Sequence, residues 1–330
     1  MRYFVTGATG FIGGHLVRQL VEAGHEVVAL VRIPPKARPL AKLGVQVFKG
    51  DVTDRETLRA PMEDVDGVFH LAGWYKVGVR DARAAEPVNV QGTRNVLATM
   101  EELGIPRGVY TSTLAVSSDT GGELKDEGYR HHGPHLSEYD RTKWLAHYQV
   151  AEPLMAEGLS LTVVMPGVTY GPGDTGPIRP LLLRYLEGRL RTLPEETAFC
   201  WGHVEDTARG HLLAMEKGEP GEAYIIAGPP HTLVEAFRMA EETTGIPAPP
   251  RRASPRTLRF LAVIMRGVAA VVPVEGPYHP ETLRVSAGVT YLGSNAKARR
   301  ELGFAPRPLR EGLEETLRHE MRLLGMAPRG

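Results

Sequence analysis

Three glycines within the first thirteen residues constrain the fold more than any other feature of this chain. The segment FVTGATGFIGGHL reads as a strand, a turn and the start of a helix, and Gly7, Gly10 and Gly13 are spaced three residues apart. Glycines in this arrangement allow a tight turn, close approach of the backbone to a pyrophosphate, and close packing of the helix on the strand. The N–H groups and dipole at the helix N-terminus then favour the phosphate charge. The loop therefore predicts a dinucleotide-binding site.

Short apolar runs alternate with amphipathic stretches through the first half of the chain. Strands are expected at residues 2–6, 26–31, 45–48, 67–72, 108–112 and 161–165. The intervening helices include residues 12–23, 87–103 and 138–157. Strands that alternate with helices indicate a parallel sheet, and nearly continuous Val-rich runs indicate strands covered on both faces. The predicted fold class is α/β, a doubly wound parallel sheet of the Rossmann type.

The character of the chain changes after residue 166, where Pro and Gly become dense. A later strand-like run, residues 222–228, could return to the sheet, and the tail from about residue 231 is helical and interrupted by Pro. We therefore expect two interleaved domains. Residues 1–165, with about 200–228, would form the nucleotide-binding domain, and residues 166–199 and 229–330 a smaller substrate domain.

Composition argues against several classes of partner. The formal net charge of zero argues against a nucleic-acid partner. The single cysteine, Cys200, permits no intrachain disulfide, so a reducing, cytoplasmic location is expected. The longest apolar run, residues 260–274, is too short to span a membrane and is broken by Arg266 and Pro273, so no membrane partner is expected. The histidines show no metal-ligand spacing, and no metal is predicted.

The end of the second strand bears on the choice of cofactor. NAD-binding versions of this unit carry an acidic residue there that binds the ribose 2′-hydroxyl. Here the strand runs into Arg32, and no acid occurs until Asp51. Arg32 could hold a 2′-phosphate, with Lys36 or Arg38 assisting, and the alternative is a solvated basic loop. We therefore predict that NADP(H) is preferred over NAD(H).

Tyr139 and Lys143 stand four residues apart in the segment YDRTK. On a helix, residues at this spacing lie on one face, so the two side chains would be neighbours. As a bare pattern the pair is weak, and its meaning depends on the surrounding segments.

Six segments, taken together, resemble a known family. They are TGATGFIG (6–13), HLAG (70–73), YTST (110–113), YDRTK (139–143), PGVTYGPGD (166–174) and GHVEDTARG (202–210). In this order they resemble an extended (atypical) short-chain dehydrogenase/reductase of the NAD(P)-dependent epimerase/dehydratase superfamily, similar to the dihydroflavonol reductases. Residues 294–317 resemble that family's C-terminal segment, so the resemblance covers nearly the whole chain.

The resemblance implies a catalytic set. Tyr139 would be the acid/base, and Lys143 would lower the pKa of Tyr139 and hold the nicotinamide ribose. An unperturbed tyrosine titrates near ~10, and an adjacent cation favours the phenolate. A hydroxyl would bind the substrate carbonyl; Thr113 is the better match, with Ser112 as the alternative. Asn89 matches a family position with either a catalytic or a structural role.

The implied cofactor and substrate contacts lie around the ends of the expected strands. The cofactor set is Gly7, Thr9, Gly10, Phe11, Ile12, Gly13, Arg32, Asp51, Val52, Leu71, Ala72, Gly73, Tyr139, Lys143, Pro166 and Val168. The substrate set is Trp74, Tyr75, Thr113 and Trp201. His70 and His203 also match family positions, and we expect both to be structural hydrogen-bonding residues.

Two positions bear on the reaction. Nucleotide-sugar members commonly carry an Asn and an Arg that bind the diphosphate, where this chain has Val168 and Phe199. Losing a donor and a cation leaves a diphosphate poorly held. The predicted activity is NADP(H)-dependent reduction of a ketone or aldehyde, or oxidation of a secondary alcohol, in a largely apolar small molecule. A nucleotide-sugar epimerase or dehydratase and a non-catalytic NADP-binding sensor are the alternatives.

Two further expectations concern helices. Residues 258–274 could help to form an apolar substrate pocket, although an ordinary core or amphipathic helix is the simpler interpretation. The resemblance also implies a homodimer that pairs through helices 87–103 and 138–157.

Overall fold

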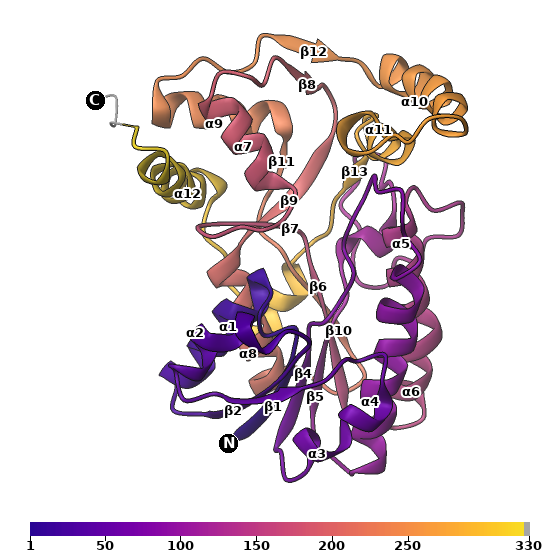
Figure 1. The fold of residues 1–330 in the computed structure, drawn as a ribbon, viewed down its shortest axis with the longest axis vertical. Helices are drawn as coiled ribbons and strands as arrows, with labels where there is room; N and C mark the ends of the chain where they lie inside the picture. Colours follow the sequence, from indigo (N-terminus) through magenta and orange to yellow (C-terminus); the bar gives the residue numbers. More distant parts are fainter. Residues whose placement is uncertain (327–330) are drawn as a thin grey trace.

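The computed structural model describes residues 1–326, and its largest element is a parallel sheet of seven strands (Figure 1). The strands lie in the order β10-β6-β5-β4-β1-β2-β3, the order of a doubly wound sheet. Their bounds are β1 Arg2–Thr6, β2 Glu26–Val31, β3 Gln46–Lys49, β4 Gly67–His70, β5 Gly108–Thr111, β6 Leu161–Pro166 and β10 Ala223–Ile226. The predicted fold class is confirmed, and the run at residues 222–228 does return to the sheet, parallel to β6.

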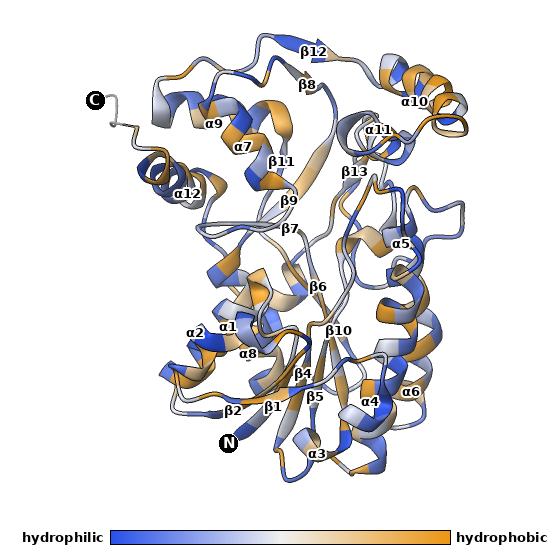
Figure 2. Ribbon diagram, in the orientation of Figure 1, coloured by the Kyte–Doolittle hydropathy of each residue, from blue (hydrophilic) through white to orange (hydrophobic). Residues whose placement is uncertain are grey.

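Helices cover both faces of this sheet (Figure 1). Alternate residues of β1 show the two-sided burial, because Phe4 packs in one core and Tyr3 and Val5 pack in the other. Figure 2 shows the corresponding hydrophobic colour along β1 and β4. The helices of this part are α1 Phe11–Glu22, α2 Arg38–Ala41, α3 Arg59–Met62, α4 Gly92–Glu102, α5 Glu138–Ala146, α6 Glu152–Ala156 and α8 Val204–Lys217.

The expected helices at 87–103 and 138–157 are each a composite. The first starts with a π-helical turn, Pro87–Gln91, and the second contains one at His147–Ala151 between α5 and α6. The expected strand at 67–72 ends at His70, so Leu71 and Ala72 lie beyond the sheet, next to the glycine loop.

The remaining elements form a second, smaller part at the top of Figure 1. Its strands are β7 Val168–Tyr170, β8 Thr192–Pro194, β9 Ala198–His203, β11 Pro230–Thr232, β12 Arg251–Ala253 and β13 Thr290–Tyr291. Its helices are α7 Ile178–Leu186, α9 Leu233–Thr244, α10 Pro255–Ala269, α11 Pro280–Val285 and α12 Leu309–Leu323. The chain interleaves the two parts, since β9 pairs in the small sheet while the next helix, α8, packs on the large one. No helix within residues 1–326 is long and apolar enough to cross a membrane.

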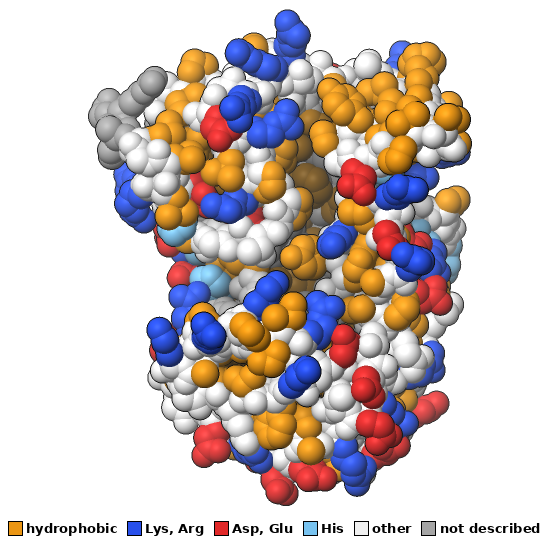
Figure 3. Space-filling view, viewed as in Figure 1, with side chains coloured by type: hydrophobic (Ala, Val, Ile, Leu, Met, Phe, Trp, Pro, Cys, Tyr) orange, Lys and Arg blue, Asp and Glu red, His pale blue; other side chains and the backbone are white. Residues whose placement is uncertain are grey.

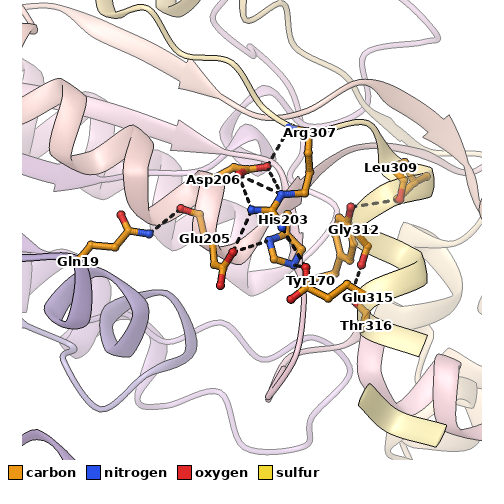
Figure 4. Close-up of polar contacts among 10 residues, drawn as sticks. All are labelled: Gln19, Tyr170, His203, Glu205, Asp206, Arg307, Leu309, Gly312, Glu315 and Thr316. Carbon is orange, nitrogen blue, oxygen red and sulfur yellow. Dashed lines mark hydrogen bonds and ion pairs between the residues drawn. The ribbon is translucent and has the colours of Figure 1, made fainter. Parts of the chain in front are cut away.

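Arg307 ties the C-terminal segment to the start of α8 (Figure 4). Its guanidinium donates to both carboxylate oxygens of Asp206, at 3.0 Å, to Glu205 at 2.9 Å and to Glu315 at 3.0 Å. Glu205 and Asp206 lie in the first turn of α8, where the helix dipole favours negative charge. The Arg307 side chain is only 20% exposed, so these charge-assisted bonds are shielded from water.

His203 lies buried beside this cluster (Figure 4). Its ring nitrogens stand 4.0 Å from Glu205 and 3.6 Å from Glu315, and neither forms a hydrogen bond among the described residues. Burial, followed by the charge of Arg307, lowers the pKa of His203, so its ring is neutral near pH 7. The expectation of a hydrogen-bonding histidine is therefore wrong at this position. The positive charge between the glutamates comes from Arg307.

We predict that Arg307→Met lowers the free energy of unfolding by about 2 kcal/mol, because it leaves three carboxylates without their shared donor. Arg300→Met is the matched control, since Arg300 is exposed and bonds only to its neighbour Glu301 among the described residues. It should change stability by less than about 0.5 kcal/mol. Urea titration followed by circular dichroism measures both values. Equal effects of the two variants would contradict the role given to Arg307.

Candidate active site

The candidate site lies where the strands of the large sheet end. The loops that follow β1, β4 and β5 leave the same edge, because parallel strands all point the same way. The strand order reverses between β1 and β4, and ligands of open α/β sheets bind at such a point. Figure 3 shows the molecular surface deeply hollowed above this edge, between the region of α7, α9 and α12 and the region of α10 and α11.

The glycine loop leaves no room for side chains at two positions. A Cβ on Gly7, which has a φ of +74°, would lie 2.7 Å from the backbone nitrogen of Ala72. A Cβ on Gly13 would overlap the carbonyl oxygen of Gly7 and lie 2.8 Å from its carbon. Helix α1 begins at Phe11, and its N-cap, Gly10, has no side chain to accept from the first-turn N–H groups. These donors fit the pyrophosphate of a dinucleotide.

A buried hydrogen-bond network joins the ends of β1 and β4. The Thr6 hydroxyl accepts from the Ala72 N–H at 3.1 Å and lies 2.7 Å from Nδ1 of His70. Nε2 of His70 lies 3.1 Å from the Thr93 hydroxyl, which in turn donates to the Asn89 carbonyl. Burial lowers the pKa of His70 to about 3, so the ring is neutral. His70 is a structural hydrogen-bonding residue, as expected, and it helps to position the backbone of Ala72.

The far end of the site, after β2 and β3, carries positive charge. Arg32, Lys36 and Arg38 are all exposed, and within residues 1–326 none of them forms an ion pair. The carboxylate of Asp51 accepts from the N–H and hydroxyl of Thr53, at 3.0 and 2.9 Å, which holds it in a local turn. The basic side chains are therefore available to a ligand at this end.

Tyr139 and Lys143 lie on one face of α5. The helix is capped by Ser137, whose hydroxyl accepts from the Asp140 N–H at 3.1 Å. The Lys143 ammonium is almost fully buried and donates to the Thr111 carbonyl at 2.7 Å and to the Tyr110 hydroxyl at 3.1 Å. Burial lowers the pKa of Lys143 to about 7. Burial also raises the pKa of Tyr139 to about 12, and contact with the Thr113 hydroxyl opposes part of that rise.

The structure distinguishes the two candidate hydroxyls after β5. Ser112 is buried, and its hydroxyl lies 2.8 Å from Nδ1 of His147, the first residue of the second π-helical turn. Thr113 is partly exposed, caps the short helix Leu114–Ser117 and contacts Tyr139. Ser112 is therefore disfavoured as a substrate ligand, because its hydroxyl is already bonded within the core.

Tyr291 and Phe199 form a stacked aromatic pair next to α5, and this pairing was not expected from the sequence. The buried carboxyl group of Asp140 accepts from the Ser137 hydroxyl at 2.6 Å and from the Tyr291 hydroxyl at 3.1 Å, and burial raises its pKa to about 7. The ring of Tyr291 stacks on Phe199, with centroids 6.0 Å apart and planes 5° apart. Tyr291 lies 151 residues from Asp140, so no local pattern could have revealed the contact.

Comparison with known proteins identifies the family. The model of the NAD dependent epimerase/dehydratase family matches residues 3–227. The chain belongs to this family. With the reductase and dehydrogenase names of its relatives, membership makes the protein an NAD(P)-dependent oxidoreductase of the extended short-chain dehydrogenase/reductase type.

Two relatives and two solved structures show the range of this epimerase/dehydratase family. A putative dihydroflavonol 4-reductase of Synechocystis sp. is 32% identical, over 96% of this chain and 93% of its own. A 4-hydroxy-2-methyl-3-oxo-4-farnesyl-3,4-dihydroquinoline-1-oxide ketoreductase of Stigmatella aurantiaca is 34% identical, over 93% and 92%. The crystal structure of gox2253 is 31% identical, with a TM-score of 0.86 over 98% and 99% of the chains. MoeE5 in complex with UDP-glucose and NAD is 25% identical, with a TM-score of 0.77 over 98% and 100%.

Burial sets the direction of the Tyr139 pKa shift in this structure. Lys143 was expected to lower the pKa of Tyr139, yet burial raises that pKa, and Lys143 directs its ammonium to the end of β5. The phenol is protonated near neutral pH, as it would be at the ordinary tyrosine pKa of about 10.

The expected substrate residues are dispersed. Trp74 is nearly buried, and Asn89 holds it by accepting from its N–H at 2.7 Å and donating to its carbonyl at 2.9 Å. Asn89 thus has a structural role, and Tyr75, the next residue after Trp74, is 55% exposed. Trp201 is wrong as a substrate residue: its ring lies in the core of the smaller part, against Tyr170, and its N–H donates to the His231 carbonyl at 2.9 Å.

We predict that Gly13→Ala weakens nucleotide binding at least about tenfold, because α1 must move away from the end of β1 to admit the methyl group. Gly14→Ala is the matched control, since its nearest neighbour would be the Ala8 carbonyl oxygen at 3.8 Å. The Gly14→Ala variant should bind the nucleotide normally, and its free energy of unfolding should rise by up to about 1 kcal/mol, because alanine has the higher helix propensity. Fluorescence titration with NADPH tests the affinities, and circular dichroism checks folding. Normal binding by folded Gly13→Ala would contradict the close approach.

Proposed function

We propose that the protein is an NADP(H)-dependent reductase of a ketone or aldehyde on a largely apolar small molecule, or the corresponding secondary-alcohol dehydrogenase. One observation carries the proposal: Tyr139 lies next to the Thr113 hydroxyl at the sheet edge that also carries the glycine loop. Tyr139 holds its phenol proton near pH 7, as a tyrosine at its ordinary pKa also does, so it can donate that proton to a carbonyl oxygen. The reductase names of relatives at 32% and 34% identity support the same direction.

In this proposal Tyr139, Thr113 and Lys143 each have a separate role in the reaction. A reduced nicotinamide, when bound, would supply a hydride to the carbonyl carbon. Tyr139 donates its phenol proton to the carbonyl oxygen as the C–O bond becomes single, and the Thr113 hydroxyl orients that oxygen by a hydrogen bond. Lys143 has three N–H donors and uses two on Thr111 and Tyr110, so a third remains for the cofactor ribose.

The chemistry around α5 supports an apolar substrate. Val168 and Phe199 occupy the positions expected to hold a diphosphate, and they lie on the paired strands β7 and β9. Phe199 is stacked on Tyr291, whose hydroxyl is bonded to Asp140. Neither Val168 nor Phe199 offers a donor or a cation, so a charged sugar nucleotide would be desolvated here without compensation.

We predict that Tyr139→Phe lowers kcat for carbonyl reduction at least about 100-fold, because the general acid is removed. The affinity for NADPH should stay within about twofold of the unaltered protein, since the ring itself is kept. NADPH oxidation is measured with aromatic and aliphatic carbonyl compounds. Tyr278→Phe, at an exposed tyrosine, is the control and should retain full activity.

Three results would contradict this function. An unchanged rate for Tyr139→Phe would remove the proton-transfer step. Selective turnover of a nucleotide sugar in the same screen would favour the epimerase or dehydratase reaction instead. A protein that binds NADPH but turns over neither class would indicate a sensor.

We further propose that the cofactor is NADP(H), supported by the basic residues beyond β2, which form no ion pair within residues 1–326. Arg32→Asp should weaken NADPH binding about 10- to 100-fold relative to NADH, because it replaces a charge-assisted phosphate contact with a repulsive one. Arg59→Asp, at an exposed arginine of α3, is the control and should not change the ratio. Titration with both nucleotides measures it. Equal affinities in the unaltered protein would contradict the preference.

A further inference from the structure

Helix α10 exposes most of its hydrophobic side chains. Phe260 is 69% exposed and Val263 is 66% exposed, and in the segment after the helix Val271 is 85% exposed. Of the fifteen residues of α10, only Ala262 is buried. Figure 3 shows these hydrophobic side chains gathered on the corner of the molecule that α10 forms in Figure 1, and Figure 2 shows the same colour along the helix. The exposed hydrophobic side chains thus form one contiguous patch. Large patches of this kind are rare on the surfaces of soluble monomeric proteins.

The same segment carries only positive charge. Residues 247–274 contain no Asp or Glu, although the whole chain has equal numbers of acidic and basic residues. The basic residues are Arg251, Arg252, Arg256, Arg259 and Arg266. None of these five forms an ion pair with any residue in the described range 1–326, whereas Arg307 alone bonds three carboxylates.

The two kinds of side chain are arranged side by side. At 3.6 residues per turn, Phe260, Val263, Ile264 and Val268 share one face of α10. Arg259 and Arg266 follow one margin of that face, and Arg256 lies at its N-terminal end, one turn before Phe260. The opposite face, around Ala262, packs against α11. A basic margin beside an exposed apolar face is the pattern of a helix that lies in a membrane interface, with the apolar face in the acyl region and the cations at the headgroups.

We propose that α10, with the exposed residues 271 and 272 that follow it, docks on the surface of an anionic lipid bilayer. A helix that lies on a bilayer needs no spanning length, so the lack of a spanning helix among the described residues is compatible with this binding. Anionic headgroups supply the negative charge that the five arginines lack within the protein.

The charges favour a bilayer over a second copy of the chain. A twofold contact centred on this face would place each copy's arginine margin near that of the other, with no acid in residues 247–274 to neutralise either. The face is also convex, since α10 projects at a corner of the molecule (Figure 1), and a convex apolar ridge suits insertion between headgroups. The proposal does not depend on the reaction or the cofactor.

The test is co-sedimentation of the full chain with vesicles. We expect binding to phosphatidylcholine–phosphatidylglycerol vesicles (about 3:1) to exceed binding to pure phosphatidylcholine at least about tenfold and to weaken as salt is added. The double variant Phe260→Ser/Val263→Ser and the triple variant Arg256→Gln/Arg259→Gln/Arg266→Gln should each lose at least about tenfold. Circular dichroism and thermal melting establish that each variant is folded.

Matched controls use exposed residues elsewhere. Leu323→Ser on α12 and the triple variant Arg59→Gln/Arg300→Gln/Arg318→Gln remove comparable apolar and basic groups, and both should bind like the unaltered chain. No binding to anionic vesicles, equal binding to neutral ones, or equal losses in the controls would each overturn the proposal. A different outcome would assign the face to a second copy of the chain. In that case vesicles would not bind, light scattering would show a dimer, and the Phe260→Ser/Val263→Ser variant would be a monomer.

Discussion

The rest of the site depends on the close approach of α1 to the end of β1. The two elements lie so close together that no side chain larger than that of glycine fits at Gly13. Gly13 lies against the carbonyl of Gly7, and Gly7 lies against the backbone of Ala72, so one loop fixes both α1 and the end of β4. From there a chain of buried hydrogen bonds runs through Thr6, His70, Thr93 and Asn89 to Thr142 on α5. The helix that carries Tyr139 is thus connected to the glycine loop by side chains that have almost no contact with solvent.

Burial then sets the direction of the pKa shifts of His70, in this network, and of Lys143 and Tyr139, on the helix that the network reaches. It makes His70 neutral, with a pKa of about 3, lowers the pKa of Lys143 to about 7, and raises the pKa of Tyr139 to about 12. All three shifts follow one rule, since a low-dielectric environment penalises the charged form of any group. Neutral His70 can accept from Thr6 and donate to Thr93, which a charged imidazolium could not do. The same burial that orders the network therefore also favours the neutral phenol of Tyr139, next to Thr113.

The parts of the site that are local in sequence could be predicted, and the parts that depend on distant contacts could not. The glycine loop and the strands of the large sheet follow from residue spacing and hydropathy, with errors of one or two residues at most ends. The roles of Ser112 and Trp201 depend on His147 and His231, which lie 35 and 30 residues away. The pKa shift of Tyr139 could not be predicted either. It is caused by burial among residues from several elements, whereas a sequence motif indicates only which residues are neighbours on one helix.

The distribution of arginine shows why a net charge of zero says little about this surface. Arg307 is held by Glu205, Asp206 and Glu315 and joins two parts of the fold. The arginines of α10 and the strand before it have no such partners among the described residues, and they stand beside exposed Phe260 and Val263. Paired arginine stabilises the protein internally, whereas unpaired arginine next to apolar surface remains available to an external anionic, partly apolar phase. The two environments occur in one chain because opposite charges are abundant near α8 and α12 and absent from residues 247–274.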